Sequence, residues 1–381
     1  MSGMRLKQTA TGLTLLLTSL ATTLTVLHLQ AEPQRRPQER RRVSEQVNDR
    51  RTVRLPQTTH SLTRQAQDRG RVFADLPMER VVLMLKSDPA QQTELENFLA
   101  EQQDPSSPHF HEWLTPQQFG ERFGASDADI DAIVQWLQSH GLRTTEISNG
   151  RREIEFSGTA RQIEEAFQTE IHNYQFNGEM HVANANDISI PEALAPVVSG
   201  VVSLHDFTPK PKFHRQPIAA NFTFGSRHGM APYDFATIYD VAALWNEGFD
   251  GTGQTIAVVG RSNLDPNDVA TFRSLNGLPA NTPEIIVNGT DPGVVSQDEE
   301  GEADLDVQWS GAVAKGAKIR FVVSKSTNST DGSVLSERYI VNNNVAPVLT
   351  SLGQTSLPFA MQKRSKRSCS SRRELALFRL R

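Results

Sequence analysis

An aperiodic stretch, residues 208–232, divides this chain into two parts whose apolar patterns differ. It holds several prolines and basic residues and has no apolar face, which is typical of an exposed linker where proteolysis is tolerated. A bare spacer is the alternative. The length of 381 residues leaves room for two domains of ordinary size. We therefore expect two packed units joined by a linker.

The first unit, residues 75–207, alternates short strand patterns with amphipathic helices. The apolar run 80–86 predicts a buried strand, and helical stripes follow at 91–101, from Ser126 to Gly141, and from Thr159. Asn-Gly pairs at 149–150 and 177–178 predict two hairpins. Strand, helix, hairpin, helix and hairpin in this order predict an α+β fold of ferredoxin-like type.

The second unit, residues 233–353, has an α/β pattern. A helix is expected near 238–245, and strand-like runs at 255–260, 284–287, 318–323 and 347–351 alternate with helices near 265–276 and 302–314. This alternation predicts a parallel sheet with helices on both faces. No GxGxxG or Walker pattern occurs, so nucleotide binding has little support.

The N-terminus predicts export. Residues 1–31 combine Arg5 and Lys7, an apolar run from Leu13 to Leu29, and Ala31 before a polar break, as in a secretory signal peptide. An uncleaved signal anchor is the alternative. Residues 32–74 are basic and lack apolar periodicity, which predicts a disordered tether. We expect a secreted, extracellular or periplasmic protein that has no membrane contact after signal cleavage.

The net charge of −5 averages very unlike parts. Residues 72–360 carry 18 basic and 38 acidic side chains, a net −20, which argues against a nucleic-acid partner.

One cysteine, Cys369, excludes a disulfide framework and a Cys-based zinc site. The basic tail, residues 354–381, either binds an anionic partner or is an out-of-frame end. His109 and His111 have no third ligand nearby and are interpreted as surface or packing residues.

The candidate chemistry lies in the run 297–307. Glu302 and Asp306 are four residues apart, so a helix would place both carboxylates on one face. Two carboxylates in a partly dry site can share a proton, and such a pair can act as a general base in acid. A solvated acidic helix start, favoured by the helix dipole, is the alternative.

Several blocks resemble a known family. The runs PHFHEWLTPQQFGERFGASDADIDAIVQWLQSHGL, EIEFSGTARQIEEAFQTEIHNY and IPEALAPVVSGVVSL resemble the activation prodomain of the sedolisin–kumamolisin serine-carboxyl peptidases. The run EGEADLDVQWSGAVAKGAKIRFV resembles the family block that holds an E-x-x-x-D helix. IAVVGRSNLDP resembles its first core strand, and NNNVAPVLTSLG the strand that lines the substrate cleft.

The resemblance implies a ferredoxin-like prodomain over residues 75–207, which packs on its peptidase domain in cis and blocks the substrate cleft until acid-triggered removal. It implies cleavage in the linker 208–232 and a subtilisin-like peptidase sheet from residue 233. Glu302 would be the general base that contacts a serine, and Asp306 would orient Glu302 and share its proton. Protein or peptide would be the substrate.

The resemblance stops at residue 353. The family's nucleophile block (Gly-Thr-Ser), its oxyanion-stabilising Asp and its calcium site have no counterpart here, so no cofactor is expected in this chain. We therefore expect an incomplete peptidase domain over 233–353 and an inactive precursor. Two other functions stay open: a secreted inhibitory module that occludes an acid protease in trans, and a basic-tailed adhesion protein.

Overall fold

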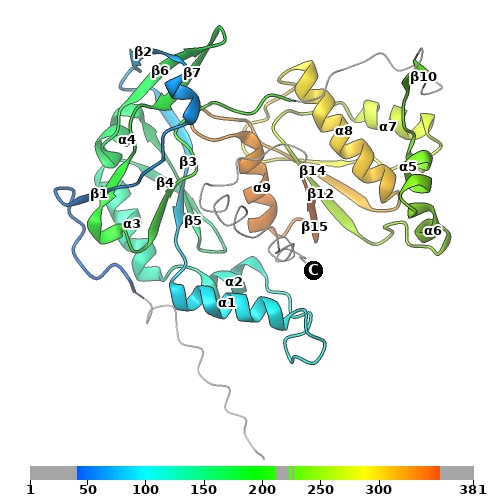
Figure 1. Cartoon of the computed structure of the whole chain (residues 1–381), viewed down its shortest axis with the longest axis horizontal. Coiled ribbons are helices and arrows are strands. Elements are labelled where there is room, and N and C mark those ends of the chain that lie inside the picture. The colour runs from blue at the N-terminus through cyan, green and yellow to red at the C-terminus, as the bar shows by residue number, and fades with distance from the viewer. Residues whose placement is uncertain (1–40, 212–222, 225–226, 352–381) are drawn as a thin grey trace, which may run out of the picture. The chain divides into compact units, whose positions relative to one another are not determined.

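The computed structural model describes residues 41–211, 223–224 and 227–351 (Figure 1). The expected signal peptide, residues 1–31, and the basic tail, residues 354–381, lie outside the described residues. We call residues 41–211 the first lobe and residues 227–351 the second lobe. Within the described part of the chain, no helix has the length and apolarity needed to cross a membrane.

The first lobe is built on a four-stranded antiparallel sheet with the order β4-β5-β3-β9. Its strands are β3 (Pro77–Leu85), β4 (Arg143–Ile147), β5 (Glu153–Thr159) and β9 (Val198–Val201). Helices α3 (Asp127–Ser139) and α4 (Ala160–Phe167) supply apolar residues to one face of this sheet. The predicted strand, helix, hairpin and helix are therefore confirmed in order.

The connection between β4 and β5 differs from the prediction. A two-residue turn at Asn149-Gly150 requires positive φ at both positions, but the positive φ, 53°, is at Arg151. The strands are instead joined by a longer loop in which the amide of Arg151 donates to the carbonyl of Ser148 at 2.8 Å. The second predicted turn is confirmed, since Asn177 and Gly178 have φ of 51° and 86°.

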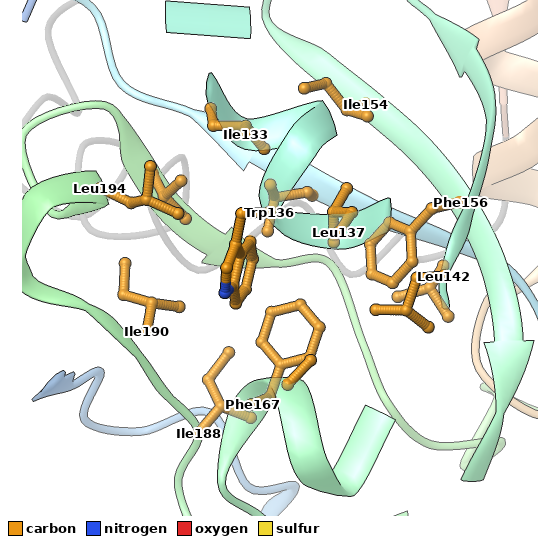
Figure 2. Close-up of a cluster of buried hydrophobic side chains, with 14 of the residues drawn as sticks. Ile133, Trp136, Leu137, Leu142, Ile154, Phe156, Phe167, Ile188, Ile190 and Leu194 are labelled. Carbon is orange, nitrogen blue, oxygen red and sulfur yellow. The ribbon is translucent and has the colours of Figure 1, made fainter. Parts of the chain in front are cut away.

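The core of the first lobe lies between this sheet and the helices α3 and α4 (Figure 2). Trp136 of α3 meets Phe167 of α4 edge to face, with ring centroids 5.2 Å apart. Phe156 of β5 stacks on the same Phe167 ring at 5.8 Å. The Trp136 indole N–H donates to Asp49 at 3.0 Å, which satisfies its one polar group. Aromatic side chains from three elements thus fix how the helices lie on the sheet.

Two further helices, α1 (Pro89–Glu101) and α2 (Pro116–Phe123), form a satellite cluster beside the main core. The first was predicted from its apolar stripe, whereas the second was not. Thr115 and Gln118 form a reciprocal cap at the start of α2, a signal that the sequence carries but that its short apolar pattern obscures.

Residues 41–74 are structured, contrary to the disorder predicted from their composition. They contain β1 (Thr52–Arg54), the 3-10 helix η2 (Ser61–Arg64) and β2 (Gln67–Arg71). Strand β1 pairs with β8 (Ser189–Pro191), which is followed by the 3-10 helix η3 (Glu192–Leu194). These elements have few apolar residues of their own. Backbone pairing and buried partners elsewhere in the lobe hold them in place.

Asp129 shows how this segment is held. Its Oδ1 accepts hydrogen bonds from the amides of Arg42 and Val43, both at 2.8 Å, and Val43 joins the main core. Ser126 caps α3 by accepting from the Asp129 amide at 3.2 Å, as the sequence predicts. The Asp129 side chain does not complete a reciprocal cap at the start of α3. It accepts instead from the amide of Val43, which lies 86 positions earlier in the chain.

A second sheet of the first lobe has the order β2-β6-β7, with β6 (Ile171–Phe176) and β7 (Glu179–Asn184) forming the second hairpin. Residues 204–206 pair with the end of β7: the Asn184 amide donates to Leu204 at 3.2 Å, and the Asp206 amide donates to Val182 at 3.1 Å. This segment leads directly into the linker.

The second lobe contains a four-stranded parallel sheet with the order β13-β14-β12-β15 (Figure 1). The strands are β12 (Thr255–Gly260), β13 (Glu284–Val287), β14 (Lys318–Val323) and β15 (Val348–Thr350). Helices α7 (Pro266–Leu275) and α8 (Gln297–Val313) cover one face and α9 (Gly332–Asn342) the other. Val258 packs on the α7–α8 side and its neighbour Val259 on the α9 side. The predicted parallel sheet with helices on both faces is confirmed.

The predicted helix near 238–245 is two short helices, α5 (Pro232–Ile238) and α6 (Val241–Asn246). Asp240 breaks the helix because its φ is 58°, in the left-handed region. The linker region contributes the two-residue strands β10 (Thr223–Phe224) and β11 (Arg227–His228), which pair with each other. The rest of the predicted linker beyond residue 211 lies largely outside the described residues.

Candidate active site and its cover

Helix α8 carries both predicted site residues. Its start is capped by Ser296, whose Oγ accepts from the Glu299 amide at 3.2 Å, and the first turn is acidic. The side chain of Glu302 is half-buried and Asp306 is buried at 5 % exposure. Because the two residues are four apart on one continuous helix, their side chains share a face.

Burial separates this pair from an ordinary acidic helix start. Asp298, in the first turn, is exposed, as a solvated helix terminus predicts. Asp306 is two turns further on and buried, and Asp304, which the sequence did not single out, is buried at 8 % exposure. Beyond its first turn the helix therefore carries two carboxylates that are shielded from water. Among the described residues, no hydrogen bond joins a serine hydroxyl to Glu302.

Arg261 organises the edge of the sheet next to this helix. It follows the last residue of β12, where the carboxyl ends of parallel strands form the usual ligand-binding edge. Its guanidinium donates to Glu299 at 2.7 and 2.9 Å and to Asp331 at 2.8 Å. Burial opposes the charge of Arg261, but the hydrogen bonds that it donates to Glu299 and Asp331, and the charges of these carboxylates, outweigh the burial and raise its pKa. Arg261 thus ties the first turn of α8 to Asp331, the N-cap of α9.

The same guanidinium also holds the chain that leaves the first lobe. Nη2 of Arg261 donates to the carbonyl of Pro209, at the start of the linker. Glu299, on the other side of Arg261, is three residues before Glu302 on α8. Through Arg261, the start of the linker is therefore connected to the first turn of α8, about one helical turn before Glu302.

A buried ion cluster joins the two lobes on the other side of the parallel sheet. Arg338 of α9 donates to Glu155 of β5 at 2.7 Å and to Glu153 at 2.6 Å. Arg80 of β3 donates to the same Glu155 carboxylate at 3.1 and 3.2 Å. Glu155 is 4 % exposed and Val82, opposite it on β3, is fully buried. This face of the first-lobe sheet is therefore the docking face for α9.

The charges in this cluster are balanced so that the carboxylate stays ionised. Burial disfavours the charged form of Glu155, but hydrogen bonds and charge from Arg80 and Arg338 lower its pKa below the ordinary value. The pKa of Arg338 is raised, since Glu153 and Glu155 outweigh the cost of its burial. Glu337, on the same helix, has a raised pKa because of burial and the nearby charge of Glu153.

A loop of the second lobe completes the contact by filling a bulge in β3. The register of β3 shifts between Met78 and Val81, and Arg80 has a left-handed φ of 54°. Carbonyls freed there accept from the loop before α9: Ser329 Oγ donates to Glu79 at 2.7 Å and Thr330 Oγ1 donates to Arg80 at 2.8 Å. The bulge and the loop satisfy each other's polar groups.

The two histidines weighed for metal binding pack locally. His109 pairs with Glu112 and lies against the Phe98 ring, and His111 stacks on Phe110. Across the described residues, no group of three or more His, Cys, Asp or Glu side chains is placed to hold a metal ion.

Comparison with known proteins relates this chain to a group of peptidase precursors by sequence. Residues 64–207 match the family model described as Pro-kumamolisin, activation domain. The chain is 28 % identical to sedolisin of Pseudomonas sp. (strain 101) over 258 residues, which cover 65 % of this chain and 44 % of sedolisin. It is 30 % identical to xanthomonalisin of Xanthomonas sp. (strain T-22) over 300 residues, or 74 % of this chain and 36 % of that protein. Kumamolisin of Bacillus sp. (strain MN-32) is 27 % identical over 275 residues, which cover 70 % of this chain and 48 % of kumamolisin.

These similarities support a sedolisin-type peptidase precursor. The match to the activation domain begins at residue 64, the last residue of η2, so it includes β2 together with the unit predicted from residue 75. The chain spans less than half the length of these sedolisin relatives. Its similarity to them covers more residues than the activation domain alone, so part of the second lobe is also related to these peptidases.

Proposed function

We propose that the chain is the precursor of a secreted serine-carboxyl endopeptidase that acts on proteins at acid pH, with the first lobe as its prodomain. The strand order β4-β5-β3-β9, with α3 and α4 in the crossings, supports a ferredoxin-like prodomain. The parallel sheet with helices on both faces supports the subtilisin-like start of a peptidase domain.

In the proposed reaction Glu302 accepts the proton of a serine hydroxyl as the serine oxygen attacks the substrate carbonyl. Asp306, buried one turn further along α8, orients Glu302 and shares its proton. The acyl-enzyme forms when the amine leaves with the proton held by Glu302, and water then reverses the sequence. Carboxylates suit this role in acid because a histidine base would already be protonated.

The hydrogen bond from Arg261 to the carbonyl of Pro209 is the observation that carries the proposed prodomain function. It fixes the exit of the first lobe beside the helix that bears Glu302, at the ligand-binding edge of the sheet. A substrate strand approaching Glu302 would meet the linker there. The docked first lobe is therefore proposed to exclude substrate in cis, and cleavage within 208–232 to remove this cover.

Acyl transfer also needs a nucleophile and an oxyanion donor. The described residues place no serine in hydrogen-bond contact with Glu302, and we propose that residues 41–351 alone do not complete the reaction. The calcium site of the family has no proposed ligands in these residues.

The test uses the chain itself and a chimera in which residues 1–351 are continued by the corresponding remainder of xanthomonalisin. We expect no hydrolysis of denatured casein by the chain at pH 3–5 and acid-dependent hydrolysis by the chimera. Glu302→Gln in the chimera should lower kcat about 10²–10⁴-fold, the usual loss for a general base. Glu300→Gln, two residues away on the same helix, is the matched control. A chimera that keeps full activity with Glu302→Gln would contradict the assigned role.

A further inference from the structure

Three histidines meet around one aromatic ring at the end of the first lobe. Phe207 is buried, and the rings of His60 and His181 stack on it with centroids 5.0 and 4.3 Å away. His205 lies against His60 at 4.3 Å between centroids and 6.2 Å from Phe207. We call His60, His181 and His205 the histidine cluster.

Two of these imidazoles are positioned in ways that require the neutral form. Nδ1 of His60 accepts a hydrogen bond from the Leu62 amide at 3.3 Å and so caps η2, which a protonated Nδ1 could not do. Nδ1 of His205 is buried and has no hydrogen-bond partner among the described residues. A proton there would place an unsatisfied charge in the interior.

Little negative charge faces the cluster from the elements packed around it. Asp206 contacts Nδ1 of His181 at 3.1 Å, and Glu179 approaches its Nε2 at 3.8 Å. Glu179 is also paired with Lys210 at 2.6 Å. On the neighbouring strands β2 and β6 the other titratable or charged groups are Asp68, Arg69, Arg71, His172 and Tyr174. Asp68 and Glu170, the residue before β6, both pair with His172, and Glu170 also pairs with Arg71.

The carboxylates of Asp206 and Glu179 therefore lie beside His181, whereas no carboxylate among the described residues pairs with His60 or His205. A single imidazolium stacked on Phe207 is tolerated, since a cation over an aromatic face is attracted to it. Two or three imidazolium rings within about 5 Å repel one another. Burial and the other histidines lower the pKa of His205 to about 3 and also lower that of His60.

The histidine cluster lies on the segment that pairs with β7 and leads to the linker. His205 bridges to Ala183, and four residues later Pro209 is held by Arg261. We propose that the histidine cluster is an acid-sensitive latch, in which protonation of His60 and His205 detaches residues 204–208 from β7 and frees the start of the linker. This inference does not depend on the proposed peptidase reaction.

The direction in which pH changes the stability of this pairing follows from the linkage between proton binding and folding. Both histidines bind protons more weakly in the folded chain than in the unfolded one, so pairing of this segment is stable above pH 6.5 and is lost progressively as the pH falls toward 3. The ion cluster at Glu155 behaves differently, because its lowered pKa keeps it charged through mild acid. The latch therefore opens before the docking face does.

Hydrogen exchange of the full chain at pH 7 and pH 5, expressed as protection factors, tests the latch. We expect protection at 204–206 to fall at least tenfold at pH 5, while β3 keeps its protection. The double variant His60→Asn/His205→Phe retains a cap acceptor and a ring, but neither new side chain can titrate. Its protection at 204–206 should therefore fall less than twofold between pH 7 and pH 5. His109→Asn, a histidine outside the cluster, should behave as the parent chain.

Unchanged protection at 204–206 in the parent chain, or a tenfold loss in the double variant, would overturn the proposal. If the double variant lacks a folded near-ultraviolet spectrum at pH 7, NMR titration of the parent histidines decides the question. A His205 that titrates below pH 5 supports the latch, and one that titrates at pH 5 or above overturns it. Neither result depends on catalysis.

Discussion

The guanidinium of Arg338 donates a 2.7 Å hydrogen bond to the buried carboxylate of Glu155, 183 positions earlier in the chain. Both side chains are nearly inaccessible to solvent, and Arg80 holds the other side of the same carboxylate. Such a contact is costly to break, because either partner alone is left as an uncompensated buried charge. It is the centre of the contact between the two lobes.

Removing the cation should weaken the folded chain strongly. We expect Arg338→Met to lower the free energy of unfolding by about 3–5 kcal/mol, since Glu153 loses its cation and Glu155 keeps only Arg80. Urea unfolding at pH 7 measures this. Lys318→Met, which breaks an exposed pair with Glu284, is the control and should cost less than about 1 kcal/mol. Equal losses for the two variants would contradict a buried docking contact.

The contact should resist mild acid. The pKa of Glu155 is lowered in the folded chain, so its stabilising contribution is present above the ordinary glutamate value and is lost as the pH falls through the lower, folded value. Glu155→Gln should therefore be destabilised at pH 7 and should lose less further stability than the parent chain below pH 4.5. Thermal unfolding from pH 7 to 3 checks this. Parallel pH profiles for both proteins would argue against an ionised Glu155.

The segment around Arg42 should depend on one aspartate. Asp129→Ala removes the acceptor for two buried amides, and we expect a loss of about 1–3 kcal/mol together with tryptic cleavage after Arg42. Asp131→Ala, an exposed change on the same helix, should leave both properties unchanged. Resistance of the Asp129 variant to trypsin would show that other contacts hold the segment.

Arg261 should control access to the linker. Arg261→Met removes the donor to Pro209 and should speed tryptic cleavage after Lys212, with the first-lobe core still intact. The matched control is Arg320→Met, since Arg320 pairs with Glu284 at a distance of 3.2 Å in a part-exposed position. If both variants are cut at the parent rate, the linker is held by something other than Arg261.

The aromatic core of the first lobe should be sensitive to truncation. Phe167 is fully buried between Trp136 and Phe156, and Phe167→Ala should cost about 3–5 kcal/mol. Phe73→Ala, at 85 % exposure, should be close to neutral in the same unfolding experiment. A small effect at Phe167 would mean that the core repacks around the gap.

The sequence predicted most elements whose signals are local. Apolar periodicity located β12, β14 and α3, and Thr159 was correctly predicted as the start of the helix that became α4. It failed at residues 41–74, because their order comes from partners such as Asp129 that are far away in the chain. Helix α9 was missed because polar residues interrupt its apolar pattern, and many of these are buried against the first lobe or the sheet.

The candidate site was predicted only in part. Spacing placed Glu302 and Asp306 on one helical face, and the structure adds the burial of Asp306 and Asp304. Arg261 was missed, since its partners Glu299 and Asp331 come from two different helices. A basic residue directly after a buried parallel strand was the available signal, because it lies at the edge where helix starts converge.

A double-mutant cycle on Glu155 and Arg338 in the full chain tests most directly whether the first lobe is docked on the second. The free energies of unfolding of the parent, Glu155→Gln, Arg338→Met and the double variant give the coupling between the two side chains. We predict a favourable coupling of about 1.5 kcal/mol or more at pH 7, as for close buried charge pairs. A coupling near zero would contradict the docking on which the proposed prodomain function rests.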